Sequence, residues 1–332
     1  QLLYFNEEYR PPFYGHIGLL NLTEHLISPF TTGYEATGIS SLYPSNTDVF
    51  RVARKQGAIG GYVHPFEAEP SDGDYGVARG FPVDTALGVL EFLEVMSGSD
   101  HLVTASVWHR ILNCGFKVTA VGGEDSISNL HRTAVVGTDR TYAYLGPKLD
   151  WGVWIEAIRQ GRTFVTNGPL IEFTINGEIS GGEIHLPASG GHLKIRATMQ
   201  SIVPVEHVEI LNNGKVIANI PLSDDRKRAE IVEKIQVKKS GWYTLRAYSL
   251  KPTHPVDDRY PFAETSPIYV YVGNHLIRSA KDARYFITWI DSISKMALAH
   301  PGWRSEKEKT HVLNQFMEAR QVFEQREKEG KR

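Results

Sequence analysis

A helical segment that ends at a glycine and is followed at once by a short apolar run occurs three times in the first half of the sequence. The glycines are Gly57, Gly115 and Gly161. Glycine is favoured at this point because it tolerates the left-handed backbone conformation that ends a helix. Each apolar run has the length of a strand and ends in polar or ionisable residues. Repeated units of this kind predict an α/β fold, with a parallel sheet or barrel, over residues 1–167.

The segment 57–65 places an ionisable side chain where such folds put their chemistry. It reads Gly-Ala-Ile-Gly-Gly-Tyr-Val-His-Pro, so an apolar run ends at His64 and Pro65 stops the strand. Functional side chains in α/β folds gather at the C-terminal ends of the strands. We therefore expect His64 to lie in a binding or catalytic site, with a simple turn as the alternative.

Composition limits the classes of function. The chain has 332 residues, a formal net charge of −2 and no long basic stripe, so nucleic acid is not an expected partner. It lacks an apolar run of about eighteen residues, so we expect no membrane span. Cys114 is the single cysteine, which excludes an internal disulfide and a cysteine-based zinc site. The thirteen histidines must then supply the nitrogen ligands of any metal.

The pattern changes near residue 170. Apolar residues alternate in several short runs, and Asn212-Asn213-Gly214 between two of them is a strong hairpin signal. These features predict an antiparallel, immunoglobulin-like β-sandwich over 170–273. Helical periodicity begins at Ser279, and Ser305 with Glu308 resembles a capping box, so a helical hairpin is expected within 274–332. The predicted domains are therefore 1–169, 170–273 and 274–332.

Several local features carry weaker expectations. The acidic, glycine-containing segment 67–85 reads as a loop, and the charged tail 324–332 is expected to fray. Asn46 or Thr47 is the expected cap of a helix that runs through Lys55.

Three strand ends in the first half carry groups that suit a metal. These are His16, His64 and Asp125, and imidazole and carboxylate ligands without cysteine fit a hydrolytic Zn, Mn or Fe site. Such a metal lowers the pKa of a bound water and polarises a carbonyl or phosphoryl group. The alternative is three unrelated polar residues in loops. Spacing does not decide between them, because the sequence has no HExxH-type motif.

Two motifs resemble known metal-binding sequences. The segments Gly15-His16-Ile17-Gly18-Leu19-Leu20 and Gly60-Gly61-Tyr62-Val63-His64-Pro65 resemble metal-bearing motifs of the PHP (polymerase and histidinol phosphatase) metallohydrolases. More narrowly, the chain resembles the carbaryl-hydrolase (CehA/McbA) group. That likeness covers essentially the whole chain and is most specific at 161–170. The other segments that carry it are 93–96, 112–116, 122–125 and 282–286.

The resemblance implies the C-terminal part of a distorted (β/α)7 barrel over 1–169 and a cluster of two or three divalent metals. The implied activity is hydrolysis of an ester, carbamate or amide bond in a small-molecule substrate by metal-activated water. Matched position by position, the implied metal ligands are Glu8, His16, His64 and Asp125, although Glu7 leaves the choice of glutamate open.

The sequence departs from the PHP pattern in two ways. It contains neither the opening His-x-His strand nor the Asp-His motif that follows it, so we expect this chain to be a fragment that holds an incomplete cluster. Asp125 is followed by Ser126 and Ile127, where PHP enzymes often have Asp-x-His. The second departure weakens the alternative of a PHP-type phosphoesterase, which also needs a basic clamp near residues 16, 64 or 125.

Other residues are secondary candidates. His131 and Arg140 are the catalytic candidates, since His131 follows Asp125 closely and Arg140 can orient a substrate. Asp100-His101 is either a ligand pair or a helix cap, with the cap favoured. His109 lies on a helix and is assigned to packing.

A non-enzymatic alternative also remains open. In it, the α/β part is a scaffold and the β-sandwich binds a glycan or a protein. The sequence leaves a homodimer open, and it predicts a soluble protein, either cytoplasmic or exported. The sequence does not decide the substrate or the identity of the metal.

Overall fold

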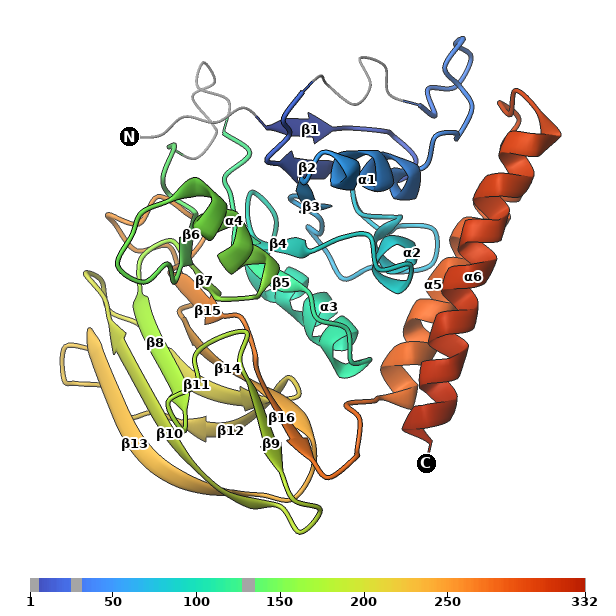
Figure 1. The fold of residues 1–332 in the computed structure, drawn as a ribbon. Helices are drawn as coiled ribbons and strands as arrows, with labels where there is room; N and C mark the ends of the chain where they lie inside the picture. Colours follow the sequence, from blue (N-terminus) through green and yellow to red (C-terminus); the bar gives the residue numbers. More distant parts are fainter. Residues whose placement is uncertain (1–5, 25–31, 127–134, 332) are drawn as a thin grey trace. The chain divides into compact units, whose positions relative to one another are not determined.

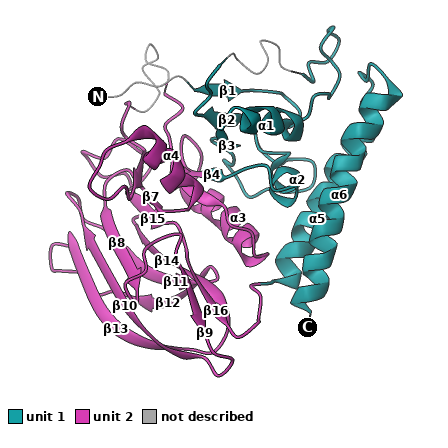
Figure 2. Cartoon of the chain, in the orientation of Figure 1, with its two compact units in different colours: residues 1–93, 278–332 teal, residues 94–277 magenta. Residues whose placement is uncertain are grey.

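The computed structural model describes residues 6–24, 32–126 and 135–331 (Figure 1). The candidate His131 lies outside these residues. The chain divides into two compact units, a first unit of residues 1–93 and 278–332 and a second unit of residues 94–277 (Figure 2). The boundaries of these units differ from those of the three predicted domains. The division into those domains therefore stays a prediction.

The sheet of the first unit is mixed rather than parallel. It contains β1 (Glu7–Tyr9), β2 (Ile17–Leu20), β3 (Ile59–Tyr62) and the first residues of β4 (Phe92–Met96). The pairs β1/β2 and β2/β3 are antiparallel, and β3/β4 is parallel. The expectation of a parallel sheet is wrong for β1 and β2, because the link between them is too short for the crossover that parallel neighbours need. Strands β2 and β3 are also antiparallel, although their link is long enough for such a crossover. No closed barrel forms among the described strands.

The first helix follows its predicted course. Helix α1 (Asn46–Lys55) is capped by Ser45, one residue before the predicted cap, in a reciprocal capping box with Asp48. Gly57 follows the helix end with a φ of +84°, the left-handed conformation that glycine tolerates.

The segment 67–85 is not all loop. Helix α2 (Phe81–Ala86) occupies its end, with a proline in the first turn, where the missing N–H is no loss.

The predicted C-terminal helical pair is confirmed. Helix α5 (Ala280–Ala299) begins after Ser279, and helix α6 (Glu306–Gly330) begins after Ser305 (Figure 1). The expected fraying of the tail is wrong, because ion pairs hold the last turns of α6. Arg284 pairs with Glu327 at 2.6 Å and Arg278 pairs with Glu329 at 2.5 Å. The buried apolar residues of α6 are Val312, Phe316, Ala319 and Phe323.

The second unit contains α3 (His101–Asn113), β5 (Thr119–Gly122), β6 (Arg140–Ala143), α4 (Trp151–Arg159) and β7 (Thr163–Thr166). Strands β6 and β7 pair antiparallel, and β7 pairs with β15 (Phe262–Thr265) of the sandwich. The predicted α/β sheet therefore does not include β6 or β7. Strand partners are chosen by long-range packing, which a local helix–glycine–strand pattern does not report.

A sandwich-like pair of sheets with a shared apolar core is present, as predicted. The pairing is not wholly antiparallel, because β9 and β16 run parallel. One sheet has the order β13-β10-β8, and the other has β12-β11-β14-β15-β7-β6 with β16 and β9 attached (Figure 1). The hairpin β11/β12 turns at Asn213 and Gly214, both with positive φ, as its sequence predicted. The strands are β8 (Leu170–Ile175), β9 (Glu183–Leu186), β10 (Gly191–Gln200), β11 (His207–Asn212), β12 (Lys215–Asn219), β13 (Arg228–Val237), β14 (Gly241–Tyr248) and β16 (Ile268–Val272).

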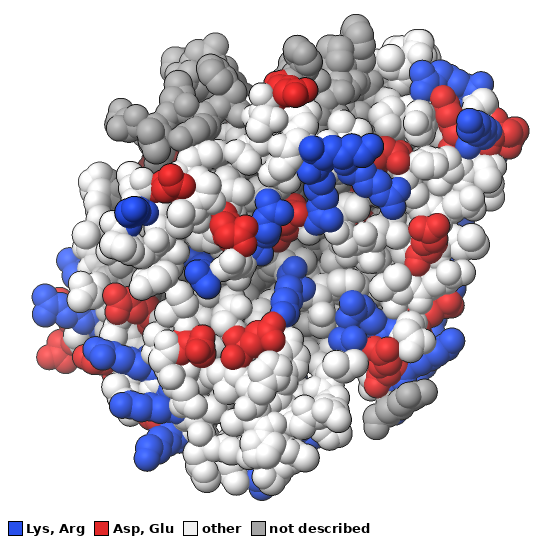
Figure 3. All heavy atoms as spheres, in the orientation of Figure 1, with Lys and Arg blue, Asp and Glu red and all other residues white. Residues whose placement is uncertain are grey.

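In the described part of the chain, no helix has the length and apolar character needed to cross a bilayer. Basic and acidic side chains are interspersed on the face drawn in Figure 3.

Candidate metal centre

Three neighbouring strands of the first unit bring Glu8, His16 and His64 together. Glu8 lies in β1 opposite Gly18 of β2, and His16 directly precedes β2. His64 follows β3, where the Val63 N–H still donates to the His16 carbonyl at 3.2 Å. Residues that are far apart in the sequence therefore meet near one end of these three strands.

The three side chains contact one another. Glu8 Oε1 lies 3.3 Å from His16 Nδ1 and 3.0 Å from His64 Nε2. The two imidazole nitrogens are 3.4 Å apart. Both histidine side chains are mostly buried, with exposed fractions of 17% and 12%, whereas that of Glu8 is 33%. One oxygen and two nitrogens thus converge at the edge of a partly open site.

Backbone geometry explains why a glycine precedes His16. Gly15 has a φ of +97°, and a Cβ at this position would lie 2.0 Å from the Val77 carbonyl oxygen. The His16 N–H donates to that same carbonyl at 2.9 Å. The chain can approach Val77 closely only where no side chain intervenes, so Gly15 positions His16.

The carboxylate of the cluster is ionised. Partial burial would raise the pKa of Glu8, but hydrogen bonds from His16 and His64 and the nearby charge of Arg10 outweigh it and hold that pKa well below its usual range. Arg10 Nε lies 3.5 Å from Glu8 Oε1. Glu8 is therefore an anionic oxygen donor at neutral pH.

The structure bears on the choice between the two glutamates. Successive side chains of a strand point to opposite faces, so Glu7 and Glu8 cannot share a site. Glu8 joins the histidines in the group whose ligand atoms lie within 4.8 Å of one another, and Glu7 does not.

The other predicted site residues lie in the second unit or outside the described residues. Asp125 is exposed in the loop after β5 and has a φ of +50°, and its role as a ligand stays a prediction. Arg140 begins β6, opposite Thr166 of β7, and its catalytic role also stays a prediction. His131 lies outside the described residues.

A second group of potential ligands was missed by the sequence analysis. His101, Asp139 and Asp258 of the second unit offer ligand atoms within 4.8 Å of one another. Asp100 is the predicted helix cap, since its Oδ1 accepts from Val103 N at 2.9 Å. His101 was the only part of this group that the sequence hinted at, because Asp139 and Asp258 belong to no local motif.

His109 has a partner that the sequence did not predict. Its Nε2 lies 2.7 Å from Oε1 of the buried Glu264, which also accepts from Thr244 at 3.0 Å. The assignment of His109 to packing is therefore incomplete, because its ring also forms a buried hydrogen bond with Glu264.

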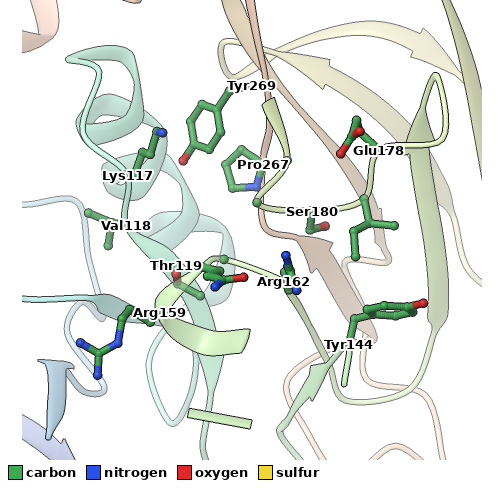
Figure 4. A pocket seen from close by; sticks show the side chains of 15 residues that line it. Lys117, Val118, Thr119, Tyr144, Arg159, Arg162, Glu178, Ser180, Pro267 and Tyr269 are labelled. Carbon is green, nitrogen blue, oxygen red and sulfur yellow. The ribbon is translucent and has the colours of Figure 1, made fainter. Parts of the chain in front are cut away.

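A separate cavity of about 490 Å³ opens in the second unit (Figure 4). Its lining includes Lys117, Arg159, Arg162, Ser180 and Tyr269, and none of the predicted site residues lines it. Lys117 is paired with Glu183 outside the lining, and Arg159 pairs with Glu156. Because two of its three cations are already paired, the cavity is a weaker candidate than the clusters of ligand atoms.

Comparison with known proteins does not assign the chain to a family. No family model matches the sequence, and no curated protein does. A solved structure of fibronectin(III)-like modules of Clostridium thermocellum CbhA is similar to part of the chain, at 23% identity and a TM-score of 0.20. The match covers 30% of this chain and 94% of that chain. At this TM-score it does not establish a common fold.

Proposed function

We propose that the chain is part of a metal-dependent hydrolase that uses Glu8, His16 and His64 to hold a divalent cation. The observation that carries the proposal is the convergence of these three donors, each within 4.8 Å of the others. Their surroundings support it, because a glycine-dependent backbone contact fixes His16 and the Glu8 carboxylate is held in its ionised form.

The donor set fits Zn, Mn or Fe. Two imidazole nitrogens and one carboxylate oxygen are the ligands that these metals share, and three protein ligands leave a position for water. When bound, such a metal supplies Lewis acidity and an activated water. The residues themselves contribute a preset geometry and a single negative charge, since both histidines bind metals in their neutral form.

The expected substrate is a small molecule with an ester, carbamate or amide bond. We propose that the mixed sheet of the first unit belongs to a PHP-type barrel, as the motifs around His16 and His64 imply. Under this proposal Asp125 and the second or third metal remain expectations from the resemblance, and His131 and Arg140 remain candidates for orienting the substrate.

A phosphoesterase is the second candidate, and Arg10 favours it. The guanidinium of Arg10 lies beside Glu8, and it is a cation that the sequence analysis did not consider. Arginine binds phosphate oxygens in a bidentate manner, so Arg10 is suited to a phosphate clamp. An Arg10→Gln variant separates the two candidates. If the protein is a phosphoesterase, this variant should impair hydrolysis of an aryl phosphate and leave hydrolysis of an aryl acetate unchanged. If the protein is not a phosphoesterase, this difference between the two substrates should not appear.

The test of the metal centre is metal binding by the chain as it exists. Purified wild type, His64→Ala and the control His192→Ala are dialysed against Zn²⁺ or Mn²⁺, and bound metal is measured by plasma mass spectrometry. His192 is an exposed sandwich residue, so its replacement controls for removal of a histidine. We expect His64→Ala to lose metal that the wild type and His192→Ala retain. Equal metal in all three proteins would overturn the proposal.

A panel of aryl esters, carbamates, amides and phosphoesters then tests the reaction. Activity that requires added metal and is lost in His64→Ala supports the hydrolase. Metal binding with no turnover of any member of the panel would favour the non-catalytic alternative.

A further inference from the structure

We propose that His101, Asp139 and Asp258 form a second divalent-cation site, built entirely within the second unit. It uses none of the residues of the Glu8 centre, and no sequence motif includes Asp139 or Asp258. One nitrogen and two carboxylate oxygens converge there within 4.8 Å.

His101 is held with its Nε2 toward Asp258. It is the first residue of α3, its side chain is fully buried, and its Nε2 lies 2.7 Å from Asp258 Oδ2. The ring is fixed by Tyr260 and Phe262, whose ring centroids lie 5.3 Å and 5.4 Å from that of His101. Packing of this kind holds a ligand in one rotamer before any ion arrives.

Asp139 is the observation that points to a ligand. Its exposed fraction is 6%, and its Oδ1 is buried with no hydrogen-bond partner among the described residues. Its carboxyl group also faces the carboxyl group of Asp258. Buried polar groups are usually paired, and two facing carboxylates need either a shared proton or a cation between them.

Further contacts fix the second carboxylate. Asn167 donates to Asp258 Oδ2 and to the Tyr260 carbonyl, and its own oxygen accepts from Phe262 N at 2.8 Å. The N–H of Arg259 donates to Asp258 Oδ1. Partners of this kind orient metal-ligating carboxylates, and their loss weakens metal binding. They also give Asn167 the role of orienting Asp258.

The alternative to a cation is a proton on Asp139. Burial, followed by the negative charge of Asp258, raises the pKa of Asp139 above its ordinary value. Without an ion, the pair is therefore an acid and a carboxylate that share one proton. Imidazole with two carboxylates suits Zn²⁺ or Mn²⁺, whereas Ca²⁺ and Mg²⁺ prefer oxygen ligands alone.

Asp139→Asn distinguishes a bound cation from a bound proton, because asparagine has the shape of a protonated aspartic acid and carries no charge. Wild type, Asp139→Asn, His64→Ala and the control Asp224→Asn are titrated with Zn²⁺ and with Mn²⁺, and bound metal and thermal midpoint are measured. Asp224 is an exposed residue of the same unit. His101→Gln provides a second variant, and circular dichroism checks that each variant is folded.

We expect Asp139→Asn and His101→Gln to lose about one ion per chain, with a Zn²⁺ affinity reduced ~10-fold or more. The rise in thermal midpoint on adding Zn²⁺ should shrink in these two variants and persist in Asp224→Asn. If folded Asp139→Asn and His101→Gln bind as much metal as the wild type, the inference is overturned and the pair holds only a proton.

The same experiment separates this inference from the proposed function. Loss of metal in His64→Ala alone would support the Glu8 centre and overturn the inference of a second site. Loss of metal in Asp139→Asn and His101→Gln alone would support the second site and overturn the proposal of a metal at the Glu8 centre. A wild type that binds neither ion would overturn both.

Discussion

The rings of His16 and His64 meet almost at right angles, at 80°, with Nδ1 of the first 3.4 Å from Nε2 of the second. Both nitrogens also border the same oxygen of Glu8. Two imidazoles that approach a carboxylate through their nitrogens form a hydrogen-bonded cluster, and they offer their lone pairs to a metal once they are deprotonated.

The Glu8 carboxylate should matter for metal binding, and its neighbour should not. Glu8→Gln removes the anionic donor of the cluster, so Zn²⁺ affinity measured by isothermal titration should fall ~10-fold or more. Glu7→Gln is the matched control because it removes the same charge from the adjacent position of β1. Equal losses in the two variants would show that net charge, rather than coordination, governs binding.

Gly15→Ala should be costly because no side chain fits at that position. Its Cβ would lie 2.0 Å from the Val77 carbonyl oxygen, on a backbone with a φ of +97°. We expect a loss of about 2 kcal/mol or more in the free energy of unfolding, measured by urea denaturation, together with weaker metal binding through His16. Gly57→Ala is the control. Gly57 also has a positive φ but nothing within 4 Å, so its loss should be about 1 kcal/mol. Similar losses would argue against steric positioning of His16.

Asp84 should make stability depend on pH. Burial, only partly offset by hydrogen bonds from Thr47 and Tyr62, raises its pKa from 3.8 to about 7. Between these values the folded chain binds more protons at this site than the unfolded chain does. Its contribution to the free energy of unfolding is therefore present below about pH 4, falls by ~1.4 kcal/mol per pH unit up to pH 7, and levels off above it.

Asp84→Asn should remove this contribution, which is measured by urea denaturation at a series of pH values. Asp72→Asn is the control, since Asp72 is exposed in the same unit. An unchanged pH profile in Asp84→Asn would show that the buried carboxyl does not change its protonation on folding.

His109 should stabilise the second unit through its buried partner. His109→Ala removes a hydrogen-bond partner of the buried Glu264 carboxylate, and a buried acceptor that loses its partner in this way costs about 1–3 kcal/mol. His185→Ala is the matched control. Its pair with Glu183 is solvent-exposed and should contribute less than about 1 kcal/mol. Thermal and urea unfolding of both variants measure the difference, and equal effects would contradict a stabilising role for the buried pair.

Local sequence signals predicted the elements whose formation depends on neighbouring residues. Helix α1 begins next to its predicted cap and is followed by Gly57, because capping and left-handed backbone conformations are decided within a few residues. The turn at Asn213-Gly214 was predicted for the same reason. In the candidate site, the positions of His16 and His64 beside their strands followed from the same patterns.

The choice of strand partners and the assembly of ligand groups were decided only by the tertiary structure. Strand β7 has the local pattern of an α/β unit but pairs with β15 of the sandwich, because pairing depends on surfaces contributed by distant segments. Asp139 and Asp258 have no local signal, and they meet His101 only when the loops before β6 and after β14 have folded. The sequence by itself determined where helices and turns begin and which histidines stand at strand ends. The tertiary structure decided which of these side chains meet, since that depends on contacts between residues far apart in the chain.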